Sequence, residues 1–161
     1  MKLKTKLLLI IVFFVMCFNI YGKNKENNKN NEINATKILD FDKEWKNNYN
    51  TFIPNSKLIQ KLKNKIKKNL KIEVYLALWC GDSRNNVPEF IKILNLSKRN
   101  ANVKFYLCDR KKDNKIEYFV KNKKVRRVPT FIFYRDDKEI GRITENPKKS
   151  LLKDFINILD K

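Results

Sequence analysis

The spacing of apolar residues predicts alternating helices and strands from residue 56 onward. Residues 56–70 carry apolar side chains at helical spacing and lysines on the other face, which indicates an amphipathic helix with Ser56 available as its N-cap. Residues 72–78 form a short, nearly continuous apolar run, typical of a central strand that is buried on both faces. A second helix is expected from Gly81 or Asp82 to Lys98.

The same analysis predicts a mixed sheet in the second half of the chain. We expect strands at Val103–Cys108, Thr130–Tyr134 and Glu139–Thr144, a short helix at Ile116–Asn122, and a final amphipathic helix that opens at Pro147 and Ser150. A βαβ crossover is thus followed by a helix and a hairpin. This order predicts an α/β fold with a mixed central sheet of about four strands, flanked by helices on both faces.

The segment before this pattern is less regular. Residues 37–53 mix polar and apolar positions, with a helical stretch near 40–48. Its large side chains, Trp45, Tyr49 and Phe52, are expected to anchor the segment against the domain.

The N-terminus has the pattern of an export signal. Lys2, Lys4 and Lys6 precede the apolar run Leu7–Ile20, which is shorter than the about 20 residues that a membrane-spanning helix needs. Residues 1–22 are therefore interpreted as a signal peptide, with cleavage after Gly22. An uncleaved membrane anchor and a lipoprotein acylated at Cys17 stay open as alternatives.

The signal peptide sets the expected organisation and location of the chain. The Asn- and Lys-rich residues 23–36 would be a flexible linker, and residues 37–161 the folded domain. We expect an exported protein of the periplasm or another extracytoplasmic compartment, in contact with the membrane only transiently through its signal. Such compartments are oxidising, which makes the cysteines of the mature chain noteworthy.

Composition narrows the chemistry further. The 161 residues include no His and three Gly, which excludes His-dependent nucleophilic catalysis and glycine-rich phosphate loops. The net charge of +20 permits anionic partners of several kinds, but no nucleic-acid recognition motif accompanies it, and no nucleic acid is expected as a partner. We expect neither a metal nor a cofactor. Cysteine chemistry is the main candidate that remains.

The segment Trp79-Cys80-Gly81-Asp82-Ser83 lies where a predicted strand ends and a helix begins. A cysteine in the first turn of a helix faces unsatisfied backbone N–H groups and the positive end of the helix dipole, so we expect a lowered pKa and a reactive thiolate. The charge of Asp82 acts in the opposite direction. The alternative is an inert, buried cysteine.

These residues carry a family resemblance. The motif Trp79–Ser83, followed by Pro88 in the helix and by Val128-Pro129-Thr130 before a strand, resembles the thioredoxin superfamily over roughly residues 56–161. It is most similar to exported bacterial thioredoxin-like proteins with a Trp-Cys-Gly-Asp-Ser motif. The resemblance implies a cis Val128–Pro129 bond facing Cys80, and a partner chain that pairs with the backbone before the proline. It thus implies a substrate-binding set of Trp79, Gly81, Asp82, Val128 and Pro129.

The chain departs from the dithiol pattern of that family at one place. Ser83 stands where the second cysteine would be, and serine cannot expel a substrate from a mixed disulfide. Ser83 is expected instead to donate a hydrogen bond to the Cys80 thiolate. Cys108, at the end of a neighbouring strand, could resolve a mixed disulfide or form a structural disulfide with Cys80; it could equally be a buried thiol without either role. Val74 replaces the acidic residue that many thioredoxins bury beneath the motif.

The leading hypothesis is therefore thiol–disulfide exchange through Cys80 alone, with Ser83 and Cys108 as further candidate catalytic residues. An oxidoreductase or isomerase of this monothiol type would act on exported proteins with disulfides or free thiols, and would need an external reducing thiol or a partner reductase. A second hypothesis is a redox-inactive thioredoxin fold that serves as a binding module. A third is lysine-driven binding to anionic lipid or nucleic acid.

Overall fold

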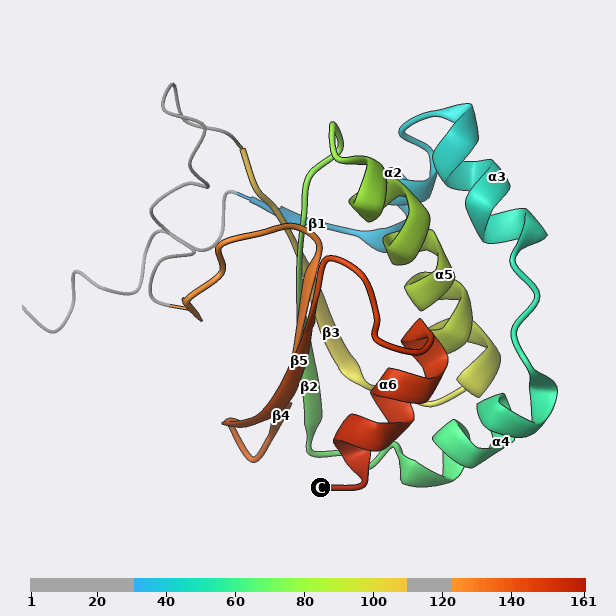
Figure 1. Cartoon of the computed structure of the whole chain (residues 1–161), viewed down its shortest axis with the longest axis vertical. Coiled ribbons are helices and arrows are strands. Elements are labelled where there is room, and N and C mark those ends of the chain that lie inside the picture. The colour runs from blue at the N-terminus through green and yellow to red at the C-terminus, as the bar shows by residue number, and fades with distance from the viewer. Residues whose placement is uncertain (1–30, 110–122) are drawn as a thin grey trace, which may run out of the picture. The chain divides into compact units, whose positions relative to one another are not determined.

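The structure, a computed structural model, describes residues 31–109 and 123–161, in which five strands form one mixed sheet (Figure 1). The strand order is β1-β3-β2-β4-β5. The central strand β2 pairs in parallel with β3 and antiparallel with β4, and β4 pairs antiparallel with β5. The mixed α/β fold predicted from the pattern is confirmed. The strands are β1 (Glu32–Ile33), β2 (Leu70–Leu76), β3 (Asn102–Leu107), β4 (Thr130–Arg135) and β5 (Lys138–Thr144).

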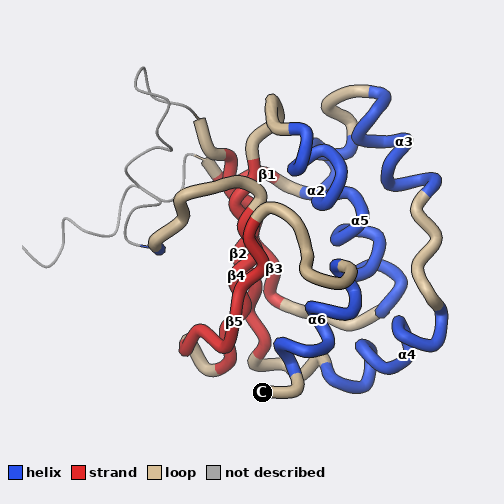
Figure 2. The backbone as a smooth tube through the Cα atoms, viewed as in Figure 1, coloured by secondary structure: helices blue, strands red, loops and turns tan. Residues whose placement is uncertain are grey.

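The described helices lie together on one side of the sheet (Figures 1 and 2), so helices on both faces, as the sequence predicted, are not seen among the described residues. They are α2 (Ala35–Leu39), α3 (Lys43–Thr51), α4 (Ser56–Lys65), α5 (Gly81–Ser97) and α6 (Leu151–Leu159). The helix expected at residues 116–122 lies outside the described residues, as do the signal peptide and most of the linker. Among the described helices, none combines the length and the apolar character needed to span a membrane.

Several boundaries differ from the sequence predictions. The end of the predicted linker contains β1, a strand of two residues that is too short to produce a periodic pattern. The helical stretch expected near 40–48 is α3, Lys43–Thr51, which begins after Asp42 because the Asp42 side chain accepts hydrogen bonds from the N–H groups of Glu44 and Trp45. The short helix α2, which precedes it, was not predicted. The N-cap of α4 is Asn55 rather than Ser56: its side chain accepts a hydrogen bond from the Leu58 N–H.

The main core lies between the helices and the sheet, and aromatic rings fill its centre. Phe90 of α5 is fully buried and packs against Phe131 and Phe155, with ring centroids 4.9 and 5.7 Å away. Trp45 of α3 is also fully buried, as expected from its predicted anchoring role. The ring contacts of Phe90 fix α5, and therefore the start of α5, against the strand β4 and the helix α6.

The opposite face of the sheet buries a carboxylate. Glu73 of β2 is 4% exposed and accepts hydrogen bonds from the hydroxyl groups of Tyr75 and Tyr134, each at 3.0 Å. The ammonium groups of Lys123 and Lys71 lie 3.1 and 3.2 Å from its oxygens. Burial by itself would raise the pKa of Glu73. The hydrogen bond and positive charge of Lys123, together with hydrogen bonds from Tyr75 and Lys71, outweigh this effect, so the pKa is lowered. Glu73 is therefore ionised at neutral pH.

The buried charge also perturbs its neighbours. Burial, and then the charge of Glu73, raise the pKa values of Tyr75 and Tyr134, so both hydroxyl groups keep the protons that they donate to Glu73. Lys123 opens the segment that leads to Val128, and its carbonyl oxygen accepts a hydrogen bond of 3.2 Å from Arg142 of β5. The Glu73 network thus fastens the start of this segment to the central strand and the edge strand.

We predict that Phe90→Ala lowers the free energy of unfolding by about 3–5 kcal/mol, because it leaves a cavity among three aromatic rings. Chemical denaturation measures the change. The matched control on the same helix is Leu96→Ala, which removes a side chain that is 44% exposed and should cost about 0.5 kcal/mol or less. Equal losses for the two variants would contradict this account of the core.

We predict that Glu73→Gln lowers stability at pH 7 by about 1.5–3 kcal/mol, the range for hydrogen bonds to a charged group. Because the pKa is lowered by folding, ionised Glu73 stabilises the native state fully above the ordinary value of 4.5, and this contribution is lost as the pH falls through the folded pKa. The variant should therefore lose less stability than the natural protein below pH 4.5, as measured by denaturation at several pH values. The control Glu32→Gln removes the carboxylate of an exposed pair with Lys104 and should change stability by about 1 kcal/mol at most. Identical acid sensitivity of the natural protein and Glu73→Gln would contradict the assignment.

Candidate functional site

The junction between β2 and α5 places Cys80 at the carboxyl end of the central strand. Cys80 is the N-cap residue of α5, with extended backbone angles, and its carbonyl oxygen accepts the first helical bond from Arg84 N–H at 3.0 Å. Its own N–H donates to the Ala77 carbonyl oxygen at 3.1 Å, which closes the turn out of the strand. The predicted position of this cysteine at a helix start agrees with the observed geometry.

The Cys80 sulfur faces the segment that precedes β4. Its thiol donates a hydrogen bond to the Val128 carbonyl oxygen, with the sulfur and the oxygen 3.2 Å apart. The Val128–Pro129 peptide bond is cis. The side chain makes no capping bond to the N–H groups of α5 and is half-buried. The sulfur therefore lies against the segment before β4 rather than against the first N–H groups of α5.

Short bonds hold the Val128–Pro129 segment in place opposite the thiol. The Thr130 hydroxyl donates to the Arg127 carbonyl oxygen at 2.7 Å, and the Glu145 N–H donates to the Pro129 carbonyl oxygen at 2.7 Å. The Arg127 guanidinium also pairs with the Glu145 carboxylate at 2.6 Å. The first residues of β4 and the residue after β5 thereby form one fixed wall of the site.

Ser83 lies beneath the motif and is fully buried. Its hydroxyl oxygen accepts a hydrogen bond from the Ala77 N–H at 3.3 Å. We expected Ser83 to donate a hydrogen bond to the Cys80 sulfur. Among the described residues, its hydroxyl group makes no such bond. In this geometry Ser83 supports the turn after β2 rather than the sulfur.

The other motif residues form the exposed rim of the site. Trp79 is 43% exposed beside Cys80, and Gly81 is also exposed. Asp82 accepts a hydrogen bond from the Asn146 amide at 3.4 Å, so the loop after β5 is joined to the first turn of α5. Trp79, Cys80, Gly81, Asp82 and the Val128–Pro129 pair are therefore brought together, as the sequence predicted.

Cys108 lies just beyond the end of β3, and it is 4% exposed. Its N–H donates to the Leu76 carbonyl oxygen at 2.7 Å, which continues the parallel pairing of β2 and β3. Cys108 and Val128 belong to one apolar cluster, and Cys80 packs against that cluster. The two cysteines thus share a side of the sheet, and a resolving role for Cys108 stays a prediction.

Two features near the site were missed in the sequence. Glu73 was hidden in a strand classed as apolar, although a lone carboxylate in such a run is itself a signal of a buried network. The packing of α3 against the start of α5 could not be foreseen from a segment of mixed pattern. Asn48 of α3 donates its amide to the Arg84 carbonyl oxygen at 2.9 Å.

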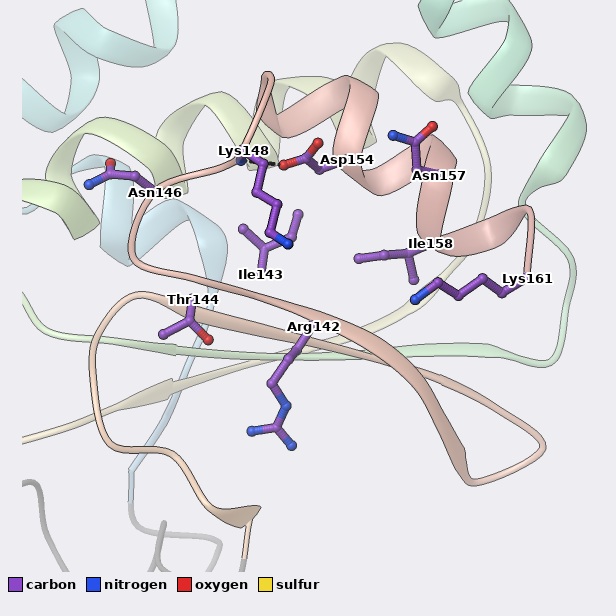
Figure 3. A pocket seen from close by; sticks show the side chains of 9 residues that line it. All are labelled: Arg142, Ile143, Thr144, Asn146, Lys148, Asp154, Asn157, Ile158 and Lys161. Carbon is purple, nitrogen blue, oxygen red and sulfur yellow. Dashed lines mark hydrogen bonds between the residues drawn. The ribbon is translucent and has the colours of Figure 1, made fainter.

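A cavity of about 450 Å³ lies elsewhere, between β5 and α6 (Figure 3). Ile143 and Ile158 line its apolar part, and Lys148 and Lys161 extend into it from the two ends of α6 (Figure 3). No motif residue lines this cavity. Within residues 31–109 and 123–161, no group of three or more Cys, Asp or Glu side chains could hold a metal ion.

Comparisons with known proteins agree with this geometry. Thioredoxin H9 of Arabidopsis thaliana is 28% identical over 86 residues, which are 53% of this chain and 57% of that protein, so the chain spans little more than half of this relative. A Pseudomonas aeruginosa protein of unknown function has the same fold, with a TM-score of 0.52, 16% identity, and coverage of 80% of this chain and 86% of that one. Fasciola hepatica thioredoxin is 30% identical, with coverage of 62% and 88% and a TM-score of 0.40.

The family comparison covers most of the chain. Residues 27–153 match a family model described as Thioredoxin, a range that includes the Cys80 motif, the Val128–Pro129 segment and all five strands. The chain belongs to the thioredoxin family.

Proposed function

We propose that the protein carries out thiol–disulfide exchange on exported proteins through a single active-site cysteine, Cys80. The observation that carries this proposal is the placement of a half-buried sulfur at the start of α5, 3.2 Å from the Val128 carbonyl oxygen and beside the exposed Trp79. A nucleophilic thiol needs access from solvent and a fixed surface against which its target can be held. The site offers both.

The reaction begins when Cys80 loses its proton. The thiolate attacks one sulfur of a partner disulfide, the Cys80–partner disulfide forms, and the other partner sulfur leaves as a thiolate. An external thiolate then attacks the Cys80 sulfur and releases the partner thiol, and a second external thiol restores Cys80. The partner disulfide gains two electrons, and two external thiols become one disulfide. Ser83 has no sulfur for the second step, so the mixed disulfide waits for an outside thiol or a partner reductase.

The Val128 carbonyl oxygen has a role on each side of this reaction. In the resting site it accepts a hydrogen bond from the S–H group of Cys80. Deprotonation removes that bond, and the carbonyl oxygen becomes available to a backbone N–H group of a bound partner chain. Docking by backbone pairing in this way orients a partner without reading its sequence.

A redox-inactive binding module is the alternative, and the buried hydroxyl of Ser83 favours it, because the position no longer supplies a second thiol. The reaction of the full chain with 4,4′-dithiodipyridine separates the two functions, since each thiol that reacts releases one coloured thiopyridone. We expect a fast release from one thiol that is missing in Cys80→Ser, which keeps the thiols of Cys17 and Cys108. Release at the same rate from Cys80→Ser, or from the unfolded protein only, would favour the binding module.

We predict that Ser83→Cys converts the site to a dithiol. The side chain at position 83 lies one turn into α5 below Cys80, the position from which a thiol can attack a mixed disulfide on Cys80. A preformed mixed disulfide between Cys80 and a peptide should release the peptide at least tenfold faster in Ser83→Cys. The product by mass spectrometry should be a disulfide between Cys80 and the introduced cysteine. The control Ser97→Cys replaces another fully buried serine of α5, far along the helix, and should not accelerate release. Equal release rates in all three proteins would contradict the proposed geometry.

A further inference from the structure

A polar groove lies beside Cys80, between the start of α5 and the helix α3 that packs along it. This α3–α5 groove has a volume of about 760 Å³ and is lined by Lys43, Glu44, Asn47, Gly81, Arg84 and Asn85. Two contacts fix its walls: the Asn48 amide donates to the Arg84 carbonyl oxygen, and the Arg84 guanidinium pairs with Glu44. The groove therefore begins at the residue directly after the proposed nucleophile.

Gly81 leaves this end of the groove open. A Cβ atom placed on Gly81 would meet no atom within 4 Å, and the residue does not have a positive φ. Neither internal packing nor backbone conformation requires a glycine here, and glycine in a helix costs about 0.5–1 kcal/mol relative to alanine. An uncovered backbone next to Cys80 does, however, let another chain approach the sulfur closely.

The groove offers hydrogen-bond donors that other groups of the protein do not use. Among the described residues, the side-chain amide of the exposed Asn85 accepts a hydrogen bond from Asn48 at 3.4 Å and donates none. Lys43 makes no ion pair with the described residues. The carboxylate that lines the groove, Glu44, is already bonded to Arg84. A ligand that fits must bring acceptors, as the carbonyl oxygens and carboxylates of a polypeptide do.

We propose that the α3–α5 groove binds the segment of the partner polypeptide that flanks the attacked cysteine on the Gly81 side, and that it favours an acidic residue there. This inference rests on the proposed exchange reaction and names the partner's chemistry. Val128 holds one side of the partner through its backbone, while Asn85 and Lys43 receive the other side. The helix α3 thereby acts as a specificity element of the site.

The experiment compares two kinds of probe that release the same thiopyridone. The first is the small, uncharged 4,4′-dithiodipyridine, and the second is a set of nine-residue peptides whose single cysteine carries a thiopyridyl disulfide. The peptides place Glu, Gln or Lys two residues before or two residues after the cysteine. The ratio of the peptide rate to the small-probe rate, with the Cys80→Ser signal subtracted, reports binding beside Cys80 separately from thiol reactivity.

We expect the Glu peptide of one orientation to react faster than its Lys counterpart. Lys43→Gln should remove this preference, and Asn85→Ala should lower the ratio for all peptides of that orientation about three- to tenfold, the effect of losing one hydrogen bond. The matched controls are Lys57→Gln, an exposed lysine at the start of α4, and Asn157→Ala, on α6 at the other cavity. Both controls should keep the natural ratio.

The outcomes separate the two proposals. Fast reaction of both probes, with ratios unchanged in Lys43→Gln and Asn85→Ala, would overturn the groove while the exchange function stands. Ratios that fall equally in the control variants would also overturn it, because general charge would then explain the preference. Failure of Cys80 to react with either probe would overturn the exchange function itself.

Discussion

The contact between the Cys80 sulfur and the Val128 carbonyl oxygen is the constraint on which the site depends. It joins two segments 48 residues apart, and each is fixed from its own side of the sheet. The helix α5 is held by aromatic packing of Phe90 in the main core, and the Val128–Pro129 segment is held by the bonds of Thr130 and Glu145. A shift of either would move the Cys80 sulfur relative to the Val128 carbonyl oxygen.

The ionised Glu73 extends this constraint to the opposite face of the sheet. Its network with Tyr75, Tyr134 and Lys123 replaces apolar packing where the chain returns toward Val128. The charge of this buried carboxylate is compensated by two tyrosine hydroxyl groups and two lysines. Because hydrogen bonds and ion pairs are strong in a low-dielectric surrounding, these partners are held in defined positions. The segment that carries Val128 therefore starts from a fixed point.

The fold was largely predictable because its long elements have strong periodicity. The apolar run of β2, the amphipathic pattern of α6 and the turn before β5 each carry a local signal, and the motif Trp79–Ser83 located the site. The short strand β1 has no such signal, because its two residues are held by pairing with β3. The start of α3 does carry a local signal, the capping residue Asp42, which the mixed pattern around it obscured. The hydrogen bond that the Ser83 hydroxyl oxygen accepts from the Ala77 N–H was not predicted, since sequence spacing does not show which backbone group lies beside a side chain in a turn.

The central claim is that Cys80, acting without a second motif thiol, forms covalent intermediates with other proteins. The most direct measurement is to acid-quench cells that make the full chain, isolate the protein under denaturing conditions, and map its disulfide-linked peptides by mass spectrometry. The account predicts peptides of other proteins joined to Cys80, and their absence from Cys80→Ser. Recovery of Cys80 as a thiol in every molecule, under conditions where a dithiol relative captures partners, would contradict it.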